Sequence, residues 1–230
     1  CFQHAFRPRP HASHKGSFGD LTIIGGSAGM TGAVLLAARM GAMAGAGRVF
    51  AAFVNSPPSF DPMHPELMCR DARTVSLDHG AAVIGPGLGT APEAVELLSR
   101  AIASALPLVL DADALNLLAH DRDLRQRTRQ RQAPTLVTPH PLEAARLLGT
   151  EVSTIQSDRF HAALSVADML GAQVILKGSG SVVASPDGKL LVNTTGNPAL
   201  ATAGSGDVLS GLCGALLAQQ MPVHEAALAA

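Results

Sequence analysis

A turn of small residues near the C-terminus delivers one carboxylate, that of Asp207, to the start of an apolar segment. Gly204 and Gly206 let the backbone approach a ligand closely, and the first free N–H groups of a following helix point at whatever lies in front of them. Such a turn binds anions, most often phosphate. Because a carboxylate opposes the anion that the turn attracts, we predict that Asp207 accepts a proton. The alternative is that Asp207 only caps the helix.

Further acids and a histidine follow two other apolar runs. Asp111, Asp113 and Asn116 come after residues 108–110, and His140 and Glu143 come after residues 135–137. Mg²⁺ prefers oxygen ligands and keeps several waters while it bridges to phosphates, so Asp111 and Glu143 suit a loose magnesium shell. His140 lies between two prolines that fix its backbone direction, which favours a contact with substrate. Each acid could instead be a helix N-terminal charge, and the histidine a hydrogen-bonded structural residue.

Three glycine-rich turns come after further apolar runs. Residues 25–33 and 85–89 permit a close approach between a ligand and the backbone. The third turn, Lys177-Gly178-Ser179-Gly180-Ser181, offers an ammonium and backbone N–H groups, which suit a nucleotide phosphate. The first two turns lack the Lys-Ser/Thr of a P-loop, and the chain has no G-x-G-x-x-G, which disfavours a conventional NAD dehydrogenase. Taken singly, each could be an ordinary tight turn.

Strand-like apolar runs alternate with helical stretches, and this pattern must position those side chains. The runs are residues 21–24, 49–53, 81–84, 108–110, 135–137 and 174–176. The alternation predicts an α/β protein with a parallel sheet, in which ligands bind beyond the carboxyl ends of the strands. We expect helices over residues 31–43 with Thr31 as cap, from Pro92 to near Ala105, and over residues 143–148 up to Gly149. Residues 181–192, with Pro186-Asp187-Gly188 as the turn, predict an antiparallel hairpin at the sheet edge.

The composition bounds the class of function. The 230 residues, 47% of them hydrophobic, suffice for one core, and a net charge of −1 implies no strongly charged partner. The arginines at 122, 125, 127, 129 and 131 have no aromatic residues between them and have Asp121 and Asp123 alongside, which favours a solvated surface segment over a nucleic-acid site. Three distant cysteines without C-x-x-C spacing indicate a reducing compartment, hence the cytoplasm, and no zinc site. The apolar stretch at 208–218 is shorter than the ~20 residues of a membrane span, so no membrane partner is expected.

Taken together, the motifs resemble the ADP/ATP-dependent NAD(P)H-hydrate dehydratase family of the ribokinase-like superfamily. In order, they are His14-Lys15-Gly16, residues 25–33, residues 41–47, His64-Pro65-Glu66-Leu67-Met68, residues 85–89, 111–118 and 138–143, Lys177-Gly178, and residues 196–211. The resemblance spans nearly the whole chain. It implies a three-layer α/β/α fold with a mainly parallel sheet and an antiparallel edge hairpin. It also implies a carbon–oxygen lyase that returns hydrated NADH or NADPH (NADHX, NADPHX) to the normal cofactor, with Mg²⁺ and with ADP or ATP as phosphoryl donor, ADP being usual in bacteria.

The resemblance assigns roles residue by residue. Ala33, the loop from Gly87 to Gly89, and His140 match positions for the hydrated nicotinamide cofactor. Lys177 to Ser181 and Gly206 match the nucleotide site, with Gly204 in the same anion turn, and Asp207 matches the catalytic aspartate. The segment from His140 to Glu143 stands where ribokinase-like kinases carry a metal-associated Asn-x-x-Glu, and histidine there fits the dehydratases better. Two departures are Leu200, where the family often has Met, and Ala203, where it often has Gly and where the anion loop becomes more restricted.

The implied reaction has two stages. Asp207 takes the proton of the hydrate hydroxyl as that oxygen attacks the terminal phosphoryl group of ADP, while Mg²⁺ and the amides of residues 204–206 neutralise the phosphate. Elimination of phosphate then restores the dihydronicotinamide and leaves AMP. A kinase of a small alcohol or vitamin precursor would use the same groups but release a stable phosphorylated product. A noncatalytic nucleotide-binding module would not need Asp207.

The two ends of the chain suggest a division into two parts. We expect residues 1–13 to be a linker or the remnant of a preceding domain, because Arg7 to His14 resembles the junction of bifunctional members in which an epimerase domain precedes the dehydratase. Residues 14–230 are expected to form the dehydratase domain, truncated within its last helix. The family further implies a homo-oligomer and an NAD(P)H-hydrate epimerase, linked or separate, as partner.

Overall fold

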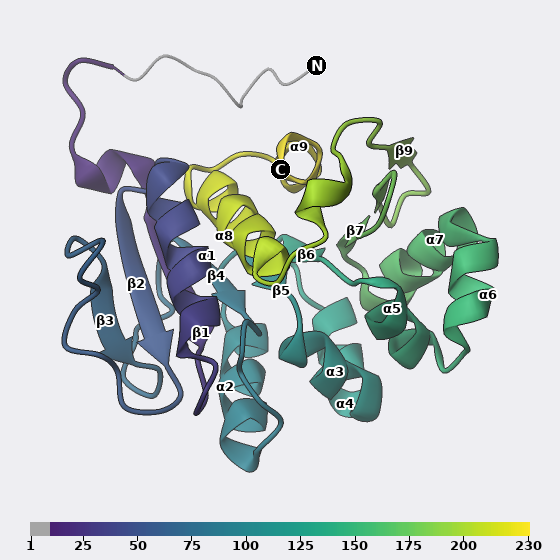
Figure 1. Ribbon diagram of the computed structural model, residues 1–230, viewed down its shortest axis with the longest axis horizontal. Coiled ribbons are helices and arrows are strands. Elements are labelled where there is room, and N and C mark those ends of the chain that lie inside the picture. The colour runs from purple at the N-terminus through teal and green to yellow at the C-terminus, as the bar shows by residue number, and fades with distance from the viewer. Residues whose placement is uncertain (1–9) are drawn as a thin grey trace.

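A sheet of nine strands runs through the described part of the chain, residues 10–230 of a computed structural model. Its order is β3-β2-β1-β4-β5-β6-β7-β8-β9 (Figure 1). The strands are β1 (Asp20–Gly25), β2 (Arg48–Phe53), β3 (Met68–Asp71), β4 (Ala81–Ile84), β5 (Leu108–Leu110), β6 (Thr135–Val137), β7 (Gln173–Leu176), β8 (Val182–Ala184) and β9 (Leu190–Val192). Strands β1 to β7 pair in parallel, whereas β8 and β9 are antiparallel. The predicted parallel sheet with an edge hairpin is therefore confirmed.

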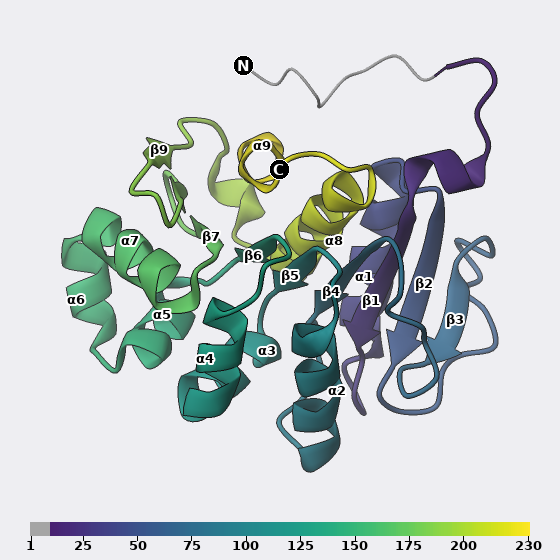
Figure 2. The same ribbon diagram turned by 180° about the vertical axis from the view of Figure 1, so that it is seen from behind.

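Helices cover both faces of the sheet, which gives three layers. One face carries α1 (Thr31–Met43), α8 (Ser205–Ala218) and α9 (Val223–Ala229). The opposite face, seen in Figure 2, carries α2 (Pro92–Ala103), α3 (Asp113–His120), α4 (Arg122–Arg129), α5 (Pro141–Leu148), α6 (Val152–Ser157) and α7 (Arg159–Leu170). Two short 3₁₀ helices, η1 (Lys15–Phe18) and η2 (Pro198–Leu200), complete the elements. The expected linker at residues 1–13 falls largely outside the described residues.

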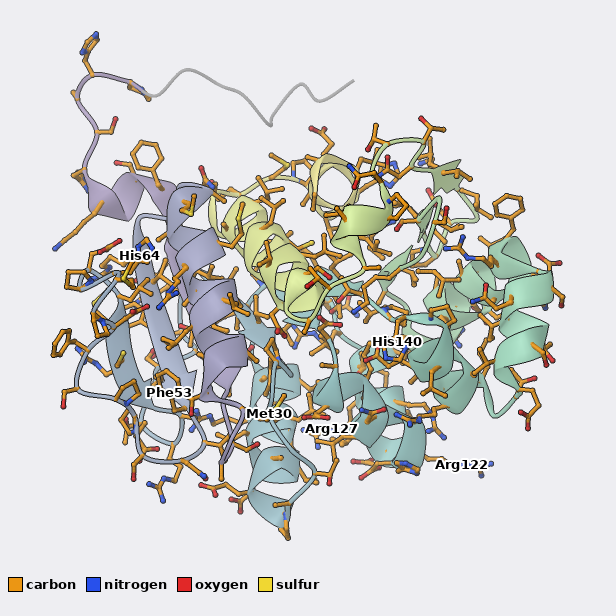
Figure 3. The ribbon with its side chains drawn as sticks, viewed as in Figure 1. Met30, Phe53, His64, Arg122, Arg127 and His140 are labelled. Atoms are coloured by element: carbon orange, nitrogen blue, oxygen red, sulfur yellow. The ribbon has the colours of Figure 1, made fainter. Side chains whose placement is uncertain are left out.

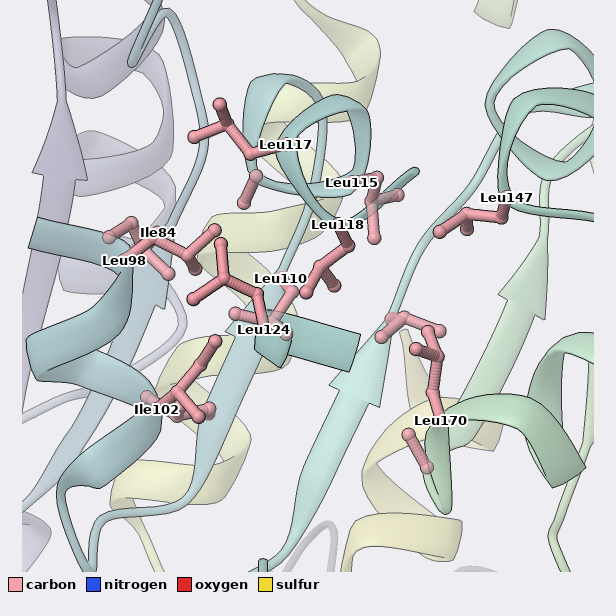
Figure 4. Close-up of a cluster of buried hydrophobic side chains, with 14 of the residues drawn as sticks. Ile84, Leu98, Ile102, Leu110, Leu115, Leu117, Leu118, Leu124, Leu147 and Leu170 are labelled. Atoms are coloured by element: carbon pink, nitrogen blue, oxygen red, sulfur yellow. The ribbon is translucent and has the colours of Figure 1, made fainter. Parts of the chain in front are cut away.

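Leucine and isoleucine side chains fill the layer between the sheet and α2 to α7 (Figure 4). Helix α2 shows why these elements form, because its buried residues recur at the spacing of one helical face: Ala94, Leu97, Leu98, Ala101 and Ile102. The strands facing this layer, β4 and β5, are buried at every position, which is typical of a parallel sheet with helices on both faces. Each fully buried Leu or Ile stabilises the fold by about 1.5–3 kcal/mol.

The ends of the helices test the expected start and stop signals. Pro92 opens α2 as predicted, and Gly149 ends α5 in the left-handed conformation with φ 64°. The expected capping role of Thr31 is wrong, because Met30 occupies the N-cap position of α1 and no side chain caps that helix. Helix α5 begins at Pro141, two residues before the expected start, because a proline at the first helical position lacks only an N–H that would be unpaired there.

Glycines bring α8 against α1 and the sheet. A Cβ on Gly211 would lie 2.1 Å from the Ala37 carbonyl oxygen of α1, and one on Gly214 would lie 2.5 Å from Val83 Cγ2 of β4. Any larger residue would push the helix away from both neighbours. This close packing holds the first turn of α8 at the carboxyl edge of the sheet, where the greener end of α8 lies in Figure 1.

The arginine-rich segment forms α4 and the turn that follows it. Arg125 donates to the carbonyls of Leu118 and Ala119, and Arg131 donates to four carbonyls of residues 101–106. Burial lowers the pKa of Arg131 to about 10. These two arginines brace neighbouring backbone, so only part of the segment is the solvated surface that the sequence predicts. Among the helices of residues 10–230, none is long and apolar enough to cross a membrane.

Candidate active site

A partly buried ion pair lies where β5 and β7 end. The Lys177 ammonium lies 2.8 Å from Asp111 Oδ1, and the Ser210 hydroxyl of α8 donates to Asp111 Oδ2 at 2.5 Å. Asp111 is 1% exposed, so its charge needs both donors. Lys177 is 66 residues and Ser210 is 99 residues from Asp111 in sequence. Asp111 and Lys177 meet because they follow parallel strands that end at the same edge of the sheet, and Ser210 reaches them from α8.

The backbone immediately after Asp111 is strained. Ala112 has φ 48° and ψ −118°, a conformation that costs a non-glycine residue about 1–3 kcal/mol. The turn separates the neighbouring acids: Asp111 lies in the ion pair, whereas Asp113 accepts the N–H of Gly89 at 2.8 Å. Asp113 thus anchors a loop and carries a helix N-terminal charge, the alternative left open for it.

His140 and Glu143 form a reciprocal cap on α5. His140 Nδ1 accepts the N–H groups of Leu142 and Glu143, at 3.1 and 3.2 Å, and Glu143 Oε2 accepts the His140 N–H at 2.7 Å. Because Nδ1 accepts, the neutral ring carries its proton on Nε2, which lies 3.3 Å from Glu143 Oε1. Burial, and then the Lys177 charge, lower the pKa of His140, which keeps the ring neutral. Figure 3 shows His140 at the start of α5.

Glu143 is the most strongly perturbed acid of the site. It is 4% exposed, and burial raises its pKa to about 7 against the opposing effect of Lys177, whose ammonium lies 3.9 Å from Glu143 Oε2. Asp111 raises that pKa further, since two carboxylates share one ammonium. The site therefore holds more negative than positive charge, which favours a bound cation.

Asp207 lies at the third position of α8, and its carboxylate has no hydrogen bond or ion pair within residues 10–230. The N-cap is Gly204, with φ 88°, and no side chain caps the helix, so the alternative that Asp207 merely caps α8 is wrong. A Cβ on Gly206 would lie 3.4 Å from Lys177 Nζ, so the start of α8 adjoins the ion pair. Burial, and then the Asp111 charge, raise the pKa of Asp207. A half-buried carboxylate without a partner, beside free helix amides, is suited to accept a proton.

The Lys177 turn joins β7 to β8 and is held by a residue that the sequence analysis did not single out. Arg159, the first residue of α7, donates to the carbonyls of three of its residues, Lys177, Ser179 and Gly180, and to that of Leu176 at the end of β7. The turn contains left-handed glycine conformations, φ 145° at Gly178 and 63° at Gly180. Ser181 closes it by donating to the Gly178 carbonyl at 3.1 Å.

The two remaining glycine turns pack against each other. Gly26 donates to the Pro86 carbonyl at 3.0 Å, and Ser27 donates to the Gly87 carbonyl at 2.7 Å. A Cβ on Gly87 would lie 3.4 Å from Ala33 Cβ, which shows that these two candidate residues are neighbours.

This pair of turns adjoins the ion pair through Gly85, where a Cβ would lie 1.8 Å from the Asp111 carbonyl oxygen. Gly89 extends the same loop and is tied to α3 through Asp113. A Cβ on Gly204 would lie 2.6 Å from Leu36 Cδ1 of α1, so the anion turn of α8 also borders α1. The structure thus places the candidate residues along one edge of the sheet.

Sequence reasoning missed Ser210 and Arg159. Ser210 lies one turn after Gly206 on α8, and its hydroxyl also donates to the Gly206 carbonyl at 3.1 Å. That spacing is the signal that could have identified it. Nothing local marks Arg159, because its partners lie 17 to 21 residues further along the chain.

The sequence predicts that Asp111 and Glu143 contribute to a loose magnesium shell. Among residues 10–230, no group of three or more His, Cys, Asp or Glu side chains could by itself hold a metal ion. The two acids nevertheless flank the same ammonium, so a role for them beside a phosphate-bound cation stays a prediction.

Comparisons with known proteins agree on one family. A family profile described as NAD(P)H-hydrate dehydratase matches residues 21–230. An ADP-dependent (S)-NAD(P)H-hydrate dehydratase of Neisseria meningitidis serogroup B is 47% identical, over 99% of this chain and 79% of the relative. A bifunctional NAD(P)H-hydrate repair enzyme of Escherichia coli is 42% identical, over 98% of this chain and 44% of its own length. This chain therefore spans less than half of that bifunctional relative.

Solved structures agree with the sequence relatives. An ADP/ATP-dependent NAD(P)H-hydrate dehydratase from Bacillus subtilis, co-crystallised with ATP and Mg²⁺, superposes with a TM-score of 0.82 at 32% identity, over 99% of this chain and 82% of that one. A ribokinase-like superfamily protein from Enterococcus faecalis superposes with a TM-score of 0.78 at 27% identity, over 92% and 75% of the two chains. The predicted ribokinase-like fold is confirmed.

Proposed function

The chain belongs to the NAD(P)H-hydrate dehydratase family, and on that premise we propose that it is an ADP-dependent (S)-NAD(P)H-hydrate dehydratase. It repairs hydrated NADH and NADPH by phosphorylating the hydrate hydroxyl and eliminating phosphate, which yields NAD(P)H, AMP and phosphate. The reaction breaks a carbon–oxygen bond, so the enzyme is a lyase. The name of the Neisseria relative supports ADP, and the ATP co-crystal of the Bacillus enzyme makes ATP the second donor to test.

The observation that carries the proposal is the environment of Asp207. This carboxylate is half-buried and has no partner among the described residues, at the start of a helix whose first amides attract anions. A surface acid would be solvated, and a structural acid would have a hydrogen-bond donor. An acid held unpaired beside an anion site is costly unless it takes part in the reaction.

Nucleotide binding is supported by two groups of donors. Gly204 and Gly206 lie in the first turn of α8, where helix amides are free, and the turn from Lys177 to Ser181 offers an ammonium and backbone N–H groups. Because Gly206 lies against Lys177 Nζ, the two donor groups converge on one region. An ammonium and free backbone N–H groups are the donors that bind phosphate oxygens.

The residues present also fit a bound Mg²⁺. Asp111 and Glu143 flank the Lys177 ammonium, and Asp207 feels the charges of Asp111 and Lys177. Burial, and to a lesser degree the Asp111 charge, raises the pKa of Glu143 to about 7. A divalent cation would balance the charge of these acids together with the charge of a polyphosphate. Mg²⁺ usually takes one or two carboxylates plus phosphate oxygens and waters, so Asp111 and Glu143 suffice as protein ligands, directly or through water. When bound, it neutralises charge on the phosphoryl oxygens.

The chain's own residues then perform the chemistry as follows. Asp207 accepts the proton of the hydrate hydroxyl while that oxygen forms its bond to the terminal phosphorus of ADP and the bond from phosphorus to the AMP oxygen breaks. The raised pKa makes Asp207 a stronger base than an ordinary aspartate. Lys177 and the amides of α8 hold the transferring group in place, which supplies most of the rate in phosphoryl transfer. The lone pair of the ring nitrogen then expels phosphate, and loss of a ring proton restores the double bond.

The adjoining glycine turns are the proposed site of the hydrated nicotinamide. Ala33 and Gly87 lie side by side, and Gly89 follows on the same loop. Absence of side chains at the glycines lets a flat ring and its amide approach the backbone. His140 presents a neutral ring, 44% exposed, at the other border of the site, where it can contact the same substrate.

Three broader proposals rest on the relatives and the sequence. The bifunctional E. coli relative supports an NAD(P)H-hydrate epimerase as partner, linked or separate. Cys69 and Cys213 are free thiols, which supports a reducing compartment and so the cytoplasm. We also propose that the chain forms a homo-oligomer, as the family resemblance implies.

The test is a direct assay of repair. The protein is mixed with NADHX and Mg²⁺, with ADP and ATP in parallel, and the absorbance band of reduced nicotinamide is followed while AMP and phosphate are quantified. A nucleotide-dependent rise supports the dehydratase and identifies the donor. A phosphorylated product that accumulates without NADH would instead support a kinase. No rise, with nucleotide bound and the fold intact, refutes the proposal.

A further inference from the structure

Arg159 makes an unusual set of contacts with the Lys177 turn. One terminal nitrogen, NH1, donates to the carbonyls of Ser179 and Gly180 at 2.6 and 3.0 Å, and the other, NH2, donates to those of Leu176 and Lys177 at 3.1 and 3.3 Å. Its Nε is buried and has no partner among the described residues. No described carboxylate pairs with its charge. One guanidinium therefore binds three carbonyls of the turn and that of Leu176 before it, while the Gly178 carbonyl accepts from the Ser181 hydroxyl.

The peptide geometry of the turn determines where its N–H groups point. Every described peptide bond is trans, so each carbonyl points opposite to the N–H of the next residue. With the carbonyls of Lys177, Ser179 and Gly180 directed at Arg159, the N–H groups of Gly178, Gly180 and Ser181 are directed away from it. These three N–H groups donate to no described residue. The turn therefore presents a row of free donors on the face opposite Arg159.

The charges around the Lys177 turn also favour binding of an anion there. The Lys177 ammonium is offset by Asp111 at 2.8 Å and Glu143 at 3.9 Å. The Arg159 guanidinium, in contrast, has only carbonyl partners, so its positive charge is not neutralised by a described acid. It lies directly behind the free N–H groups, where it raises the positive potential that an anion meets.

We propose that Arg159 is the positioning residue of the nucleotide site. It orients the Lys177 turn so that the N–H groups of Gly178, Gly180 and Ser181 bind a phosphate of the adenine nucleotide, and its charge strengthens that binding from behind. The proposal rests on the proposed function, since it needs a nucleotide at this turn.

Lysine cannot replace arginine in this role. Arginine offers a planar fork with several fixed donors, whereas lysine offers a single nitrogen that cannot reach both ends of the turn. The turn is also shaped to the fork, because a Cβ on Gly178 would lie 2.9 Å from Arg159 NH2 and that glycine has φ 145°. Arg159→Lys thus keeps the charge but loses the orientation, and Arg159→Gln removes the charge as well.

The chain provides a matched control in Arg131. Its guanidinium also donates to four backbone carbonyls, those of Ala101, Ile102, Ser104 and Leu106. These lie at the end of α2 and in the loop that leads into the amino end of β5, at the opposite edge of the sheet from the Lys177 turn. Arg131→Lys should therefore lower stability as Arg159→Lys does, without touching the nucleotide turn. Melting temperatures of both variants report the shared structural cost.

The experiment measures the Kd of ADP by calorimetry, together with the KM values and kcat of repair, for the wild type, both lysine variants and Arg159→Gln. We expect Arg159→Lys to raise the Kd and KM of ADP by about 10-fold, the loss of one to two charge-assisted hydrogen bonds to phosphate. The KM of the hydrate should stay near that of the wild type, and Arg131→Lys should bind ADP normally. Arg159→Gln should weaken ADP binding at least as much, and it takes the place of the lysine variant in the comparison if that variant does not fold.

Two results would overturn the proposal while the wild type remains an active dehydratase: unchanged ADP affinity in both Arg159 variants, or an equal loss of ADP affinity in Arg131→Lys. A wild type that binds no ADP would overturn this proposal and the proposed function together. The wild-type measurements thereby separate the two failures.

Discussion

Replacement of Asp207 by asparagine tests the proposed mechanism most directly. The change is nearly isosteric and removes no hydrogen bond, since the carboxylate has none among the described residues. It also removes a charge that burial and Asp111 disfavour, as the raised pKa of Asp207 indicates. The variant should therefore melt at or above the temperature of the wild type. ADP should bind at least as tightly, because a negative charge beside the phosphate site is lost.

The catalytic effect should be large, because asparagine cannot accept the hydroxyl proton. Proton transfer by a positioned base is worth about 10²–10⁴ in rate, or about 3–5 kcal/mol of barrier. We expect kcat to fall by that factor with little change in the KM of ADP. In the wild type, activity requires deprotonated Asp207. The fall of kcat on the acid side of its pH profile should therefore occur above the ordinary aspartate range, and it should disappear in the variant.

The assay follows formation of reduced nicotinamide from NADHX with saturating ADP and Mg²⁺, and calorimetry gives the Kd of ADP. Asp187→Asn is the matched control, since Asp187 lies in the exposed turn between β8 and β9 and pairs with Lys189. It should leave kcat unchanged. If Asp207→Asn retained more than about a tenth of the wild-type kcat, proton transfer to Asp207 would not be the chemistry of this site. A loss of ADP binding would instead make Asp207 a binding residue.

Three further changes probe the surroundings of the site. Gly206→Ala should fold normally and gain about 0.5–1 kcal/mol from helix propensity, yet bind ADP more weakly in calorimetry, because the new Cβ would lie 3.4 Å from Lys177 Nζ in the anion turn. Ala112→Gly should raise the free energy of unfolding in urea by about 1 kcal/mol, because relief of the positive φ outweighs the entropy of glycine; a loss of stability would show that the backbone there is unstrained. Glu143 holds its proton more tightly when folded, with a pKa of about 7 against 4.5, so wild-type stability should fall as pH rises between these values by on the order of 3 kcal/mol. Glu143→Gln should flatten that slope in urea titrations at several pH values, and an unchanged slope would mean that Glu143 is charged throughout.

Much of the fold was predictable because its signals are local. Buried parallel strands appear as apolar runs, and all six predicted runs are strands of the sheet. The edge hairpin followed from its turn residues, and the end of α5 from a single glycine. Strand β3 was not predicted, because its four residues, Met-Cys-Arg-Asp, are mixed in polarity and lie at an edge of the sheet. Thr31 failed as a cap because the preceding loop places Met30 in that position.

By itself, the sequence determined which residue types follow each strand and hence the chemistry available: an acid before an apolar helix, a lysine in a glycine turn, and acids and a histidine after the central strands. Tertiary structure decided which of them meet. It paired Lys177 with Asp111 rather than with Asp113, left Asp207 without a partner, and brought Arg159 behind the Lys177 turn. Propensity and turn chemistry act over a few residues, whereas the pairing of charges depends on the spacing between strands and helices. That spacing exists only once the sheet and its glycine-packed helices have assembled.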